Sequence, residues 1–140
     1  MSKLILHVDG DSFFASCEVS LDPRRQGLPV VTGHERGIAT AMSKEAKALG
    51  ISRGMPVFKM KKLFPEVIII SSDYITYEIF SQRMSAIVTR FASEVEEYSI
   101  DECFATLDDV SDARKIKEAL YRELGMTFSV GVAPTKVLAK

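Results

Sequence analysis

Short runs of Val, Ile, Leu and Phe alternate along this chain with longer segments in which apolar residues recur every three or four positions. Each short run, bounded by polar or turn-forming residues, predicts a β-strand. The first run, residues 3–9 (KLILHVD), ends on an acidic residue. The other predicted strands are residues 28–33, 37–41, 66–71, 94–99, 102–107 and 126–133.

Apolar residues spaced three and four positions apart predict the helices. Residues 73–92 give the strongest pattern, with apolar positions at Tyr77, Phe80, Met84, Ile87, Val88 and Phe91. The other predicted helices are residues 12–20, 43–50, a short segment after Pro56, 111–125 and a segment that opens at Pro134. The expected N-caps are Asp11 or Ser12, Ser43, and Ser111 or Asp112, and the expected stops are Gly50 and Gly125.

The order of these elements predicts a ferredoxin-like fold of the α+β (α/β) class. Without residues 22–73, the order is strand, helix, strand, strand, helix, strand, which is the βαββαβ order of that fold. In such a fold the first and third strands lie side by side and antiparallel, so the end of the first meets the start of the third. Residues 22–73 are then an insertion, in which the strands at 28–33 and 37–41 form a hairpin.

Acidic residues stand at the two strand ends that this topology brings together. Asp9 ends the first strand, and Asp101 and Glu102 begin the third. Because neighbouring strands lie about 4.8 Å apart, these carboxylates can share two divalent ions about 3.5–4 Å apart, the arrangement used for in-line phosphoryl transfer. Mg²⁺ prefers such oxygen ligands, and the carbonyl of Gly10 is a further candidate. The alternative is that these residues and Asp11 are ordinary acids of turns and helix caps.

Composition indicates the expected number of domains, the state of the thiols and the cellular location. The chain has 140 residues, of which 46% are hydrophobic, and this suits one soluble domain. The two cysteines, Cys17 and Cys103, form no disulfide framework or metal-ligand spacing, so we expect reduced thiols and a cytoplasmic location. We expect no signal peptide and no membrane segment, because no apolar run reaches the roughly 20 residues that a membrane helix needs.

Charge is divided unevenly along the chain, although the net charge is only −1. Residues 43–62 contain six Lys or Arg against one acid, Glu45. Residues 94–112 contain eight Asp or Glu and no Lys or Arg. The first region could face phosphates and the second could hold cations, unless both are simply solvated faces of opposite sign.

Four motifs carry a resemblance to a known family. They are DGDSFFASCE (9–18), EAKALGISRGMP (45–56), VEEYSIDECF (95–104) and SVGVAPTKVLAK (129–140). In this order and at about this spacing, they resemble the Y-family translesion DNA polymerases, most closely the UmuC/ImpB/MucB/SamB branch. The resemblance extends from Leu4 to Lys140.

The resemblance implies an architecture and an activity. Residues 1–21 and 74–140 correspond to the N-terminal part of a palm, truncated at its C-terminal end, and residues 22–73 correspond to a small fingers subdomain. Such enzymes are DNA-directed DNA polymerases that transfer nucleotides from dNTPs to a primer 3′-OH with two Mg²⁺ ions, for which Mn²⁺ can substitute. They act in error-prone translesion synthesis, in DNA repair and in the SOS response to DNA damage.

The resemblance also implies partners and a limit. The partners are primer–template DNA, dNTP, a sliding clamp and a UmuD-like accessory subunit, with no membrane. Relatives are considerably longer than this chain, and the missing thumb and little-finger parts grip the duplex. We therefore expect this fragment alone to bind DNA weakly and to be inactive as a polymerase.

Single residues acquire roles from the same resemblance. Phe14 corresponds to the steric gate, a ring that collides with the 2′-OH of a ribonucleotide. Phe13 and Phe14 begin a helix, whose free N–H groups can hold a triphosphate, although the Phe13 ring suits core packing equally well. The implied catalytic, metal-binding carboxylates are Asp9, Asp101 and Glu102, with Gly10 as a further metal ligand.

Four lysines complete the implied set. Lys44 and Lys47 stand where many relatives carry a Tyr and an Arg that grip the triphosphate. Lys47 keeps the positive charge but lacks the bidentate geometry of Arg, and Lys44 departs from the family pattern as a ligand. Lys136 and Lys140 lie in a shared motif and are implied to approach phosphate, DNA or the catalytic carboxylates.

Three other interpretations stay open. A haloacid-dehalogenase-type phosphatase also places Asp-x-Asp after an apolar first strand, with Asp9 as nucleophile and Asp11 as general acid, but it needs a parallel sheet. A nucleotidyl cyclase shares two-metal chemistry on a ferredoxin-like core. A palm-like module that only binds partners is the non-catalytic alternative.

Overall fold

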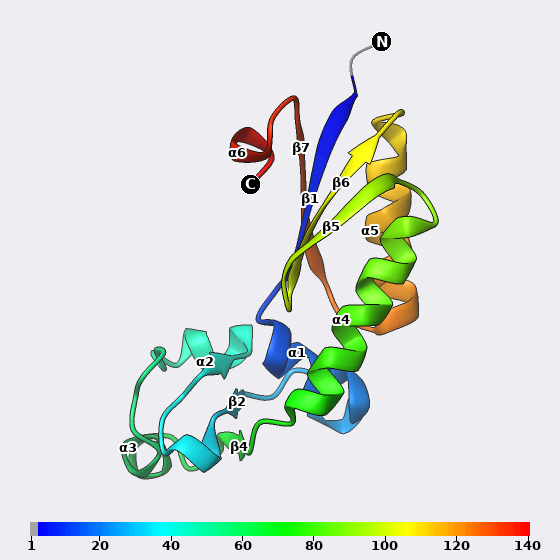
Figure 1. Cartoon of the computed structure of the whole chain (residues 1–140). Coiled ribbons are helices and arrows are strands. Elements are labelled where there is room, and N and C mark those ends of the chain that lie inside the picture. The colour runs from blue at the N-terminus through cyan, green and yellow to red at the C-terminus, as the bar shows by residue number, and fades with distance from the viewer. Residues whose placement is uncertain (1–2) are drawn as a thin grey trace. The chain divides into compact units, whose positions relative to one another are not determined.

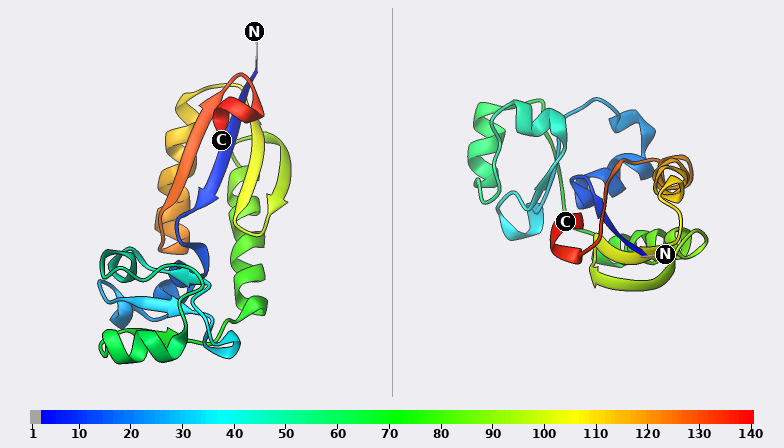
Figure 2. Two further views of the ribbon diagram at one scale, coloured as in Figure 1. Left: turned by 90° about the vertical axis from the view of Figure 1, so that its left-hand side faces the viewer. Right: turned by 90° about the horizontal axis from the view of Figure 1, so that it is seen from above.

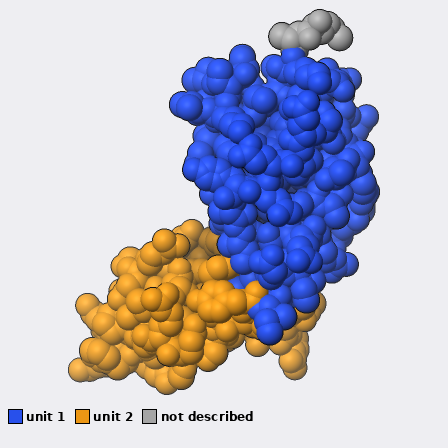
Figure 3. Space-filling view, in the orientation of Figure 1, with its two compact units in different colours: residues 1–11, 75–140 blue, residues 12–74 orange. Residues whose placement is uncertain are grey.

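Residues 3–140 are described by a computed structural model, in which contacts separate the chain into two units (Figure 3). Unit 1 comprises Met1–Asp11 and Ile75–Lys140, and unit 2 comprises Ser12–Tyr74. The predicted insertion at residues 22–73 falls within unit 2, and the contacts group residues 12–21 with it. The naming of residues 1–21 and 74–140 as palm, and of 22–73 as fingers, stays a prediction.

Unit 1 is built on a four-stranded sheet in the order β5-β6-β1-β7 (Figure 1). The strands are β1 (Leu4–Gly10), β5 (Ser93–Ser99), β6 (Glu102–Leu107) and β7 (Phe128–Ala133). β1 pairs antiparallel with both β6 and β7, and β5 pairs antiparallel with β6. The predicted fold class is therefore confirmed, as is the antiparallel contact between the first and third strands of the βαββαβ pattern.

Two long helices cover one face of this sheet, and a short helix lies over the other (Figures 1 and 2). The long helices are α4 (Tyr74–Thr89) and α5 (Ser111–Leu124), and the short one is α6 (Lys136–Ala139). Side chains alternate along a strand, so the fully buried Leu6 and Val8 of β1 share one face, and His7 and Asp9 share the other. Within residues 3–140, no helix is long and apolar enough to cross a membrane.

A glycine allows α6 to lie directly against β7. A Cβ atom at Gly131 would lie only 2.1 Å from the carbonyl oxygen of Ala139, which is far inside van der Waals contact. Thr135 caps α6 by accepting a hydrogen bond from the Leu138 N–H with its side chain. The close approach places the C-terminal lysine of the chain over the same sheet face as Asp9.

Unit 2 contains a small mixed sheet in the order β3-β2-β4. Its strands are β2 (Val30–Thr32), β3 (Ala41–Met42) and β4 (Ile68–Ile70). Its helices are α1 (Phe13–Leu21), α2 (Lys44–Ala48) and α3 (Val57–Leu63), with 3₁₀ turns at Pro23–Arg25 and His34–Arg36. β2 pairs antiparallel with β3, which confirms the predicted hairpin, and parallel with β4. The core of this unit is formed by Val31, Ala39, Ala46, Ile51, Val57 and Met60.

Some local predictions were wrong. The strand expected at 37–41 is confined to Ala41–Met42, because Gly33 and Gly37 adopt left-handed φ values of 112° and 73° that turn the chain through a 3₁₀ segment. Ser12 precedes α1 but makes no capping hydrogen bond, and its φ is 47°. α5 is preceded by Asp109, whose carboxylate accepts from the Ser111 N–H at 2.9 Å, rather than being capped by Ser111 or Asp112.

Other local predictions were confirmed. Ser43 caps α2 by accepting from the Ala46 N–H at 3.3 Å. Gly125 ends α5 in a left-handed conformation with φ of 69°, as helix-stop glycines do. α4 begins within one residue of the predicted start but ends at Thr89, so Phe91 lies beyond it.

Candidate active site

The acidic strand ends lie together on unit 1. Asp9 is the direct register partner of Glu102 across β1 and β6. The Gly10 N–H donates a 2.9 Å hydrogen bond to the Asp101 carbonyl, which ties the turn before β6 to the end of β1. The structure thus brings together the two strand ends that carry Asp9, Asp101 and Glu102.

Electrostatic repulsion is concentrated on Asp9. Burial raises the pKa of its carboxyl group from 3.8 to about 6, and the negative charges of Asp101 and Glu102 add to the increase. His7 acts in the opposite direction but does not cancel it. A carboxylate that resists ionisation beside other carboxylates is stabilised by a nearby cation, so this end of the sheet is suited to binding positive charge.

Glu102 is held by three neighbours. His7 Nε2 lies 3.0 Å from its Oε1, Ser99 Oγ lies 3.0 Å from its Oε2, and Lys140 Nζ lies 3.5 Å from its Oε1. Burial acts to raise the pKa of Glu102, but hydrogen bonds from His7 and Ser99 and the charge of Lys140 together lower it. Glu102 is therefore an ionised carboxylate with a fixed orientation.

The donor chemistry of this cluster fits a hard divalent cation. Asp9, Asp101 and Glu102 offer carboxylate oxygens, the ligand type that Mg²⁺ prefers. Ser99 Oγ also lies 3.0 Å from Asp101 Oδ1, so its single hydroxyl proton serves Asp101 or Glu102 but not both at once. Within residues 3–140, no three His, Cys, Asp or Glu side chains lie close enough together to form a ready-made ligand set.

The two predicted aromatic residues differ in their surroundings. Phe13 is only 4% exposed, so its ring belongs to the core and only its backbone N–H could face a phosphate. Phe14 is half-buried, and its ring meets Tyr74 edge to face at 5.7 Å between centroids. Of these two rings, Phe14 is thus the one with a surface that remains available to a ligand.

Lys47 lies near the first turn of α1. Its Nζ donates a 2.9 Å hydrogen bond to Ser12 Oγ, and Ser12 directly precedes the helix. The N–H groups at the start of a helix attract anions, so an ammonium group beside them strengthens the same preference. Lys44 is exposed at the first residue of α2.

The lysines of α6 lie over acidic and aromatic residues of unit 1. Lys136 forms an ion pair with Glu96 and lies 5.5 Å from the Phe104 ring centroid. Lys140 lies 4.6 Å from the Tyr98 ring centroid and pairs with Glu102. Of these two predicted lysines, Lys140 is therefore the one in contact with a predicted metal ligand.

A comparison of sequences decides the family. Residues 8–140 match the family described as impB/mucB/samB. The chain belongs to this family.

Relatives of this impB/mucB/samB chain are named DNA polymerases. DNA polymerase IV of Methanoculleus marisnigri is 38% identical over 99% of this chain and 42% of its own length. DNA polymerase IV 1 of Bacillus subtilis is 36% identical over 99% of this chain and 36% of its own length. The chain thus spans well under half of these relatives.

Solved structures agree with the family assignment. The crystal structure of DinB from Sulfolobus solfataricus superposes with a TM-score of 0.86 at 33% identity, over 97% of this chain and 43% of that one. An insertion ternary complex of Dbh DNA polymerase superposes with a TM-score of 0.86 at 32% identity, over 97% and 44%. The phosphatase alternative is not favoured, because β1 pairs antiparallel with both its neighbours.

Two residues beside the acidic cluster have contacts that their sequence positions did not reveal. His7, which is buried, contacts Glu102, and the period of a strand places it on the same face as Asp9. Asp11 is not a helix cap: its carboxylate accepts from Thr127 Oγ1 at 2.9 Å and from Ser129 Oγ at 2.5 Å. Only the fold reveals these contacts to β7 and the residue before it, since no local pattern connects Asp11 to residues so distant in sequence.

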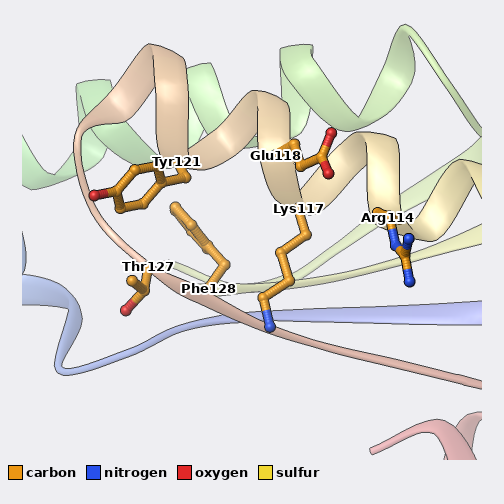
Figure 4. A pocket seen from close by; sticks show the side chains of 6 residues that line it. All are labelled: Arg114, Lys117, Glu118, Tyr121, Thr127 and Phe128. Carbon is orange, nitrogen blue, oxygen red and sulfur yellow. The ribbon is translucent and has the colours of Figure 1, made fainter.

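A hollow of about 410 Å³ lies elsewhere on unit 1, between α5 and the start of β7 (Figure 4). Its lining residues are Arg114, Lys117, Glu118, Tyr121, Thr127 and Phe128. None of the predicted site residues lines it. The acidic cluster, whose neighbouring charges raise the pKa of Asp9 in addition to burial, is therefore the stronger candidate for chemistry.

Proposed function

We propose that the protein containing this chain is an error-prone translesion DNA polymerase of the Y family, and that this chain is its N-terminal palm and fingers portion. The observation that carries the proposal is Asp9 facing Glu102, beside Asp101, at one end of an antiparallel sheet. Relatives that are similar over nearly the whole chain are named DNA polymerase IV. These points support template-directed nucleotidyl transfer from a dNTP to a primer 3′-OH.

Two Mg²⁺ ions, or Mn²⁺ in their place, belong to this proposal. Asp9, Asp101 and Glu102 would hold them, with the Gly10 carbonyl as a further ligand, because positive charge offsets the burial and the repulsion that together raise the pKa of Asp9. Bound ions would supply Lewis-acid activation of the primer hydroxyl and stabilisation of the leaving pyrophosphate. The contribution of the chain is to hold the carboxylates in position.

Unit 2 is proposed to bind the incoming nucleotide. The N–H groups at Phe13 and Phe14 and the ammonium of Lys47 form a cationic end of α1 that suits a triphosphate. The Phe14 ring, braced by Tyr74, would act as the steric gate against a ribose 2′-OH. Lys44 is proposed as a weaker, solvent-exposed contact to the same phosphates.

Lys136 and Lys140 are proposed to change partners when substrate binds. Both lie over acidic residues of unit 1, and a bound cation at Glu102 would compete with Lys140 for the same carboxylate. A displaced ammonium is then free to contact a phosphate of the nucleotide or the DNA.

The wider biological role rests on the family resemblance. We propose primer–template DNA as the macromolecular substrate, and a sliding clamp and a UmuD-like subunit as partners. A cytoplasmic location and induction in the SOS response complete the proposal. Because the chain spans only 36–44% of the relatives described above, it is expected to be inactive as a polymerase by itself.

Primer extension by the full-length protein tests the catalytic proposal. The reaction would contain Mg²⁺ and an intact or an abasic template, with Asp101→Ala, Phe14→Ala and the matched control Asp108→Ala. Asp108 is an exposed acid just after β6, so its removal should leave activity unchanged. Loss of extension in Asp101→Ala and incorporation of ribonucleotides by Phe14→Ala would assign the metal site and the gate.

The opposite outcome favours the non-catalytic module. If the parent protein extends no primer with Mg²⁺ or Mn²⁺, even with clamp and candidate subunits added, the polymerase proposal is wrong. Equal activity of Asp101→Ala and Asp108→Ala would also contradict it, because the carboxylate cluster would then have no role in the reaction.

A further inference from the structure

The short helix α3 has one buried side and one strongly exposed side. Val57 and Met60 pack into the core of unit 2. The opposite side, here called the α3 outer face, consists of Phe58, Lys59, Lys61, Lys62 and Leu63. Phe58 is 76% exposed and Leu63 is 53% exposed.

The α3 outer face is part of ordered structure. The Val57 N–H donates to the Gly37 carbonyl at 2.9 Å, and the Phe64 N–H donates to the Met60 carbonyl at 2.8 Å. A bridge between Ile38 and Pro56 fixes the entry to the helix. The ring of Phe58 is therefore held in water by a fixed backbone, although apolar surface in water costs free energy.

Side chains on this face are arranged in mixed pairs. Residues four apart on a helix are neighbours, so Phe58 lies beside Lys62, and Lys59 lies beside Leu63. α3 contains three lysines and no acid. Each apolar residue of the face thus has a lysine one helical turn away.

Other exposed aromatic residues lack this combination. Tyr98 has Lys140 Nζ 4.6 Å from its ring centroid, but it lies on β5, a strand with three acidic residues, so its surroundings are of mixed charge. Tyr121, 62% exposed on α5, has Lys117 four residues before it, but Glu118 and Glu123 stand nearby in sequence. Uniform positive charge around an exposed ring distinguishes the α3 outer face from both.

We propose that the α3 outer face binds single-stranded DNA, with a base stacked on Phe58 and backbone phosphates paired with Lys59 and Lys62. An exposed ring beside cations is the chemistry by which proteins hold single strands, because unpaired bases offer flat faces and phosphates offer charge. A duplex hides its base faces, so Phe58 would gain little from it. The choice of DNA as the anion rests on the proposed polymerase function, in which a template supplies an unpaired strand.

Fluorescence anisotropy with a labelled oligo-dT of about 12 nucleotides tests this proposal on the 140-residue chain. Buffer with EDTA and without dNTP keeps the measurement independent of the carboxylate site. The variants are Phe58→Ala and the double variant Lys59→Gln/Lys62→Gln. The matched controls are Tyr121→Ala and Lys117→Gln, which alter a lysine and an aromatic residue at the same spacing on α5. Circular dichroism verifies that each variant is folded.

Each variant has a distinct expected result. Phe58→Ala should weaken binding of oligo-dT about fivefold or more, yet change binding of an abasic strand of equal length less than about twofold, because only the former has bases to stack. The lysine double variant should weaken binding of both strands. It should also reduce the slope of log affinity against log salt by about 1.4, because each of the two lost phosphate contacts contributes about 0.7. The α5 controls should stay within about twofold of the parent.

Several results would overturn the proposal. Phe58→Ala could weaken binding of the abasic strand and of oligo-dT to the same extent. The α5 controls could lose as much oligo-dT binding as the α3 variants. The parent could also fail to bind oligo-dT at about 0.1 mM protein in low salt. Competition by a polyglutamate peptide as effective as that by oligo-dT would instead indicate an acidic protein partner. If the full-length parent extends no primer with Mg²⁺ or Mn²⁺ while these variants lose oligo-dT binding, the polymerase proposal fails and the surface proposal stands.

Discussion

Replacing Asp9 by Asn should stabilise the chain in the absence of divalent metal. The pKa of Asp9 is raised from 3.8 to about 6 by burial and by its acidic neighbours. One pKa unit corresponds to 1.36 kcal/mol, so full ionisation would cost the folded state at most about 3 kcal/mol. Asp9 is partly exposed, and solvent screening reduces this to about 1 kcal/mol. Asn removes the ionisable group and hence this cost.

The pH dependence follows from the direction of the shift. The folded state holds the Asp9 proton more tightly than the unfolded state, so stability is fully present below about pH 4 and is lost as pH rises through about 6. The free energies of unfolding of parent and Asp9→Asn should therefore agree near pH 4, and differ by about 1 kcal/mol near pH 7.5 in EDTA.

Urea unfolding followed by circular dichroism measures this difference, with Asp108→Asn as the matched control. The control removes an exposed acid after β6 and should change stability little. Millimolar Mg²⁺ should stabilise the parent more than Asp9→Asn, since a ligand that binds only the folded state raises its stability. If Asp9→Asn were less stable than the parent at pH 7.5 in EDTA, the argument that repulsion strains this cluster would be refuted.

Three further substitutions test other features of the structure. Gly131→Ala should cost more than about 1 kcal/mol and speed amide exchange at Ala139 and Lys140, because the new Cβ would lie 2.1 Å from the Ala139 oxygen; unchanged exchange would contradict the packing of α6. His7→Leu should raise the pKa of Glu102 in NMR titrations and weaken Mg²⁺ binding about tenfold, whereas His7→Gln and the exposed control His34→Leu should affect binding less. Ser43→Ala should cost about 2 kcal/mol in urea unfolding, because Ser43 Oγ accepts from the N–H groups of both Val30 and Ala46; a loss no larger than that of exposed Ser52→Ala would contradict this role.

The fold was predictable because its local patterns agree with its topology. The apolar run at residues 3–9 and the helical spacing at 111–125 belong to a βαββαβ order that leaves few arrangements for the sheet. That order predicts that the end of the first strand meets the start of the third, and the structure adds the register that pairs Asp9 with Glu102. The order of the elements and the positions of the acids were therefore sufficient to locate the acidic cluster.

The parts that escaped prediction depend on contacts distant in sequence. Asp11 is a residue type that often caps helices, yet its carboxylate accepts hydrogen bonds from Thr127 and Ser129, which belong to a segment distant in sequence. Ser12 is likewise a good cap type, but its left-handed backbone and its bond to Lys47 place its hydroxyl elsewhere. Local propensity describes what a residue can do, and the fold selects among those options.

The position of β1 in the sheet has a consequence for synthesis on the ribosome. β1 emerges before both of its partners, because it pairs on one side with residues 102–107 and on the other with residues 128–133. Until those residues are made, the nascent chain carries an apolar strand with both hydrogen-bonding edges unsatisfied, a form prone to aggregation. Unit 2, by contrast, is continuous in sequence and can fold during elongation. Protection of β1 by a chaperone should therefore matter most while residues 12–127 are being translated.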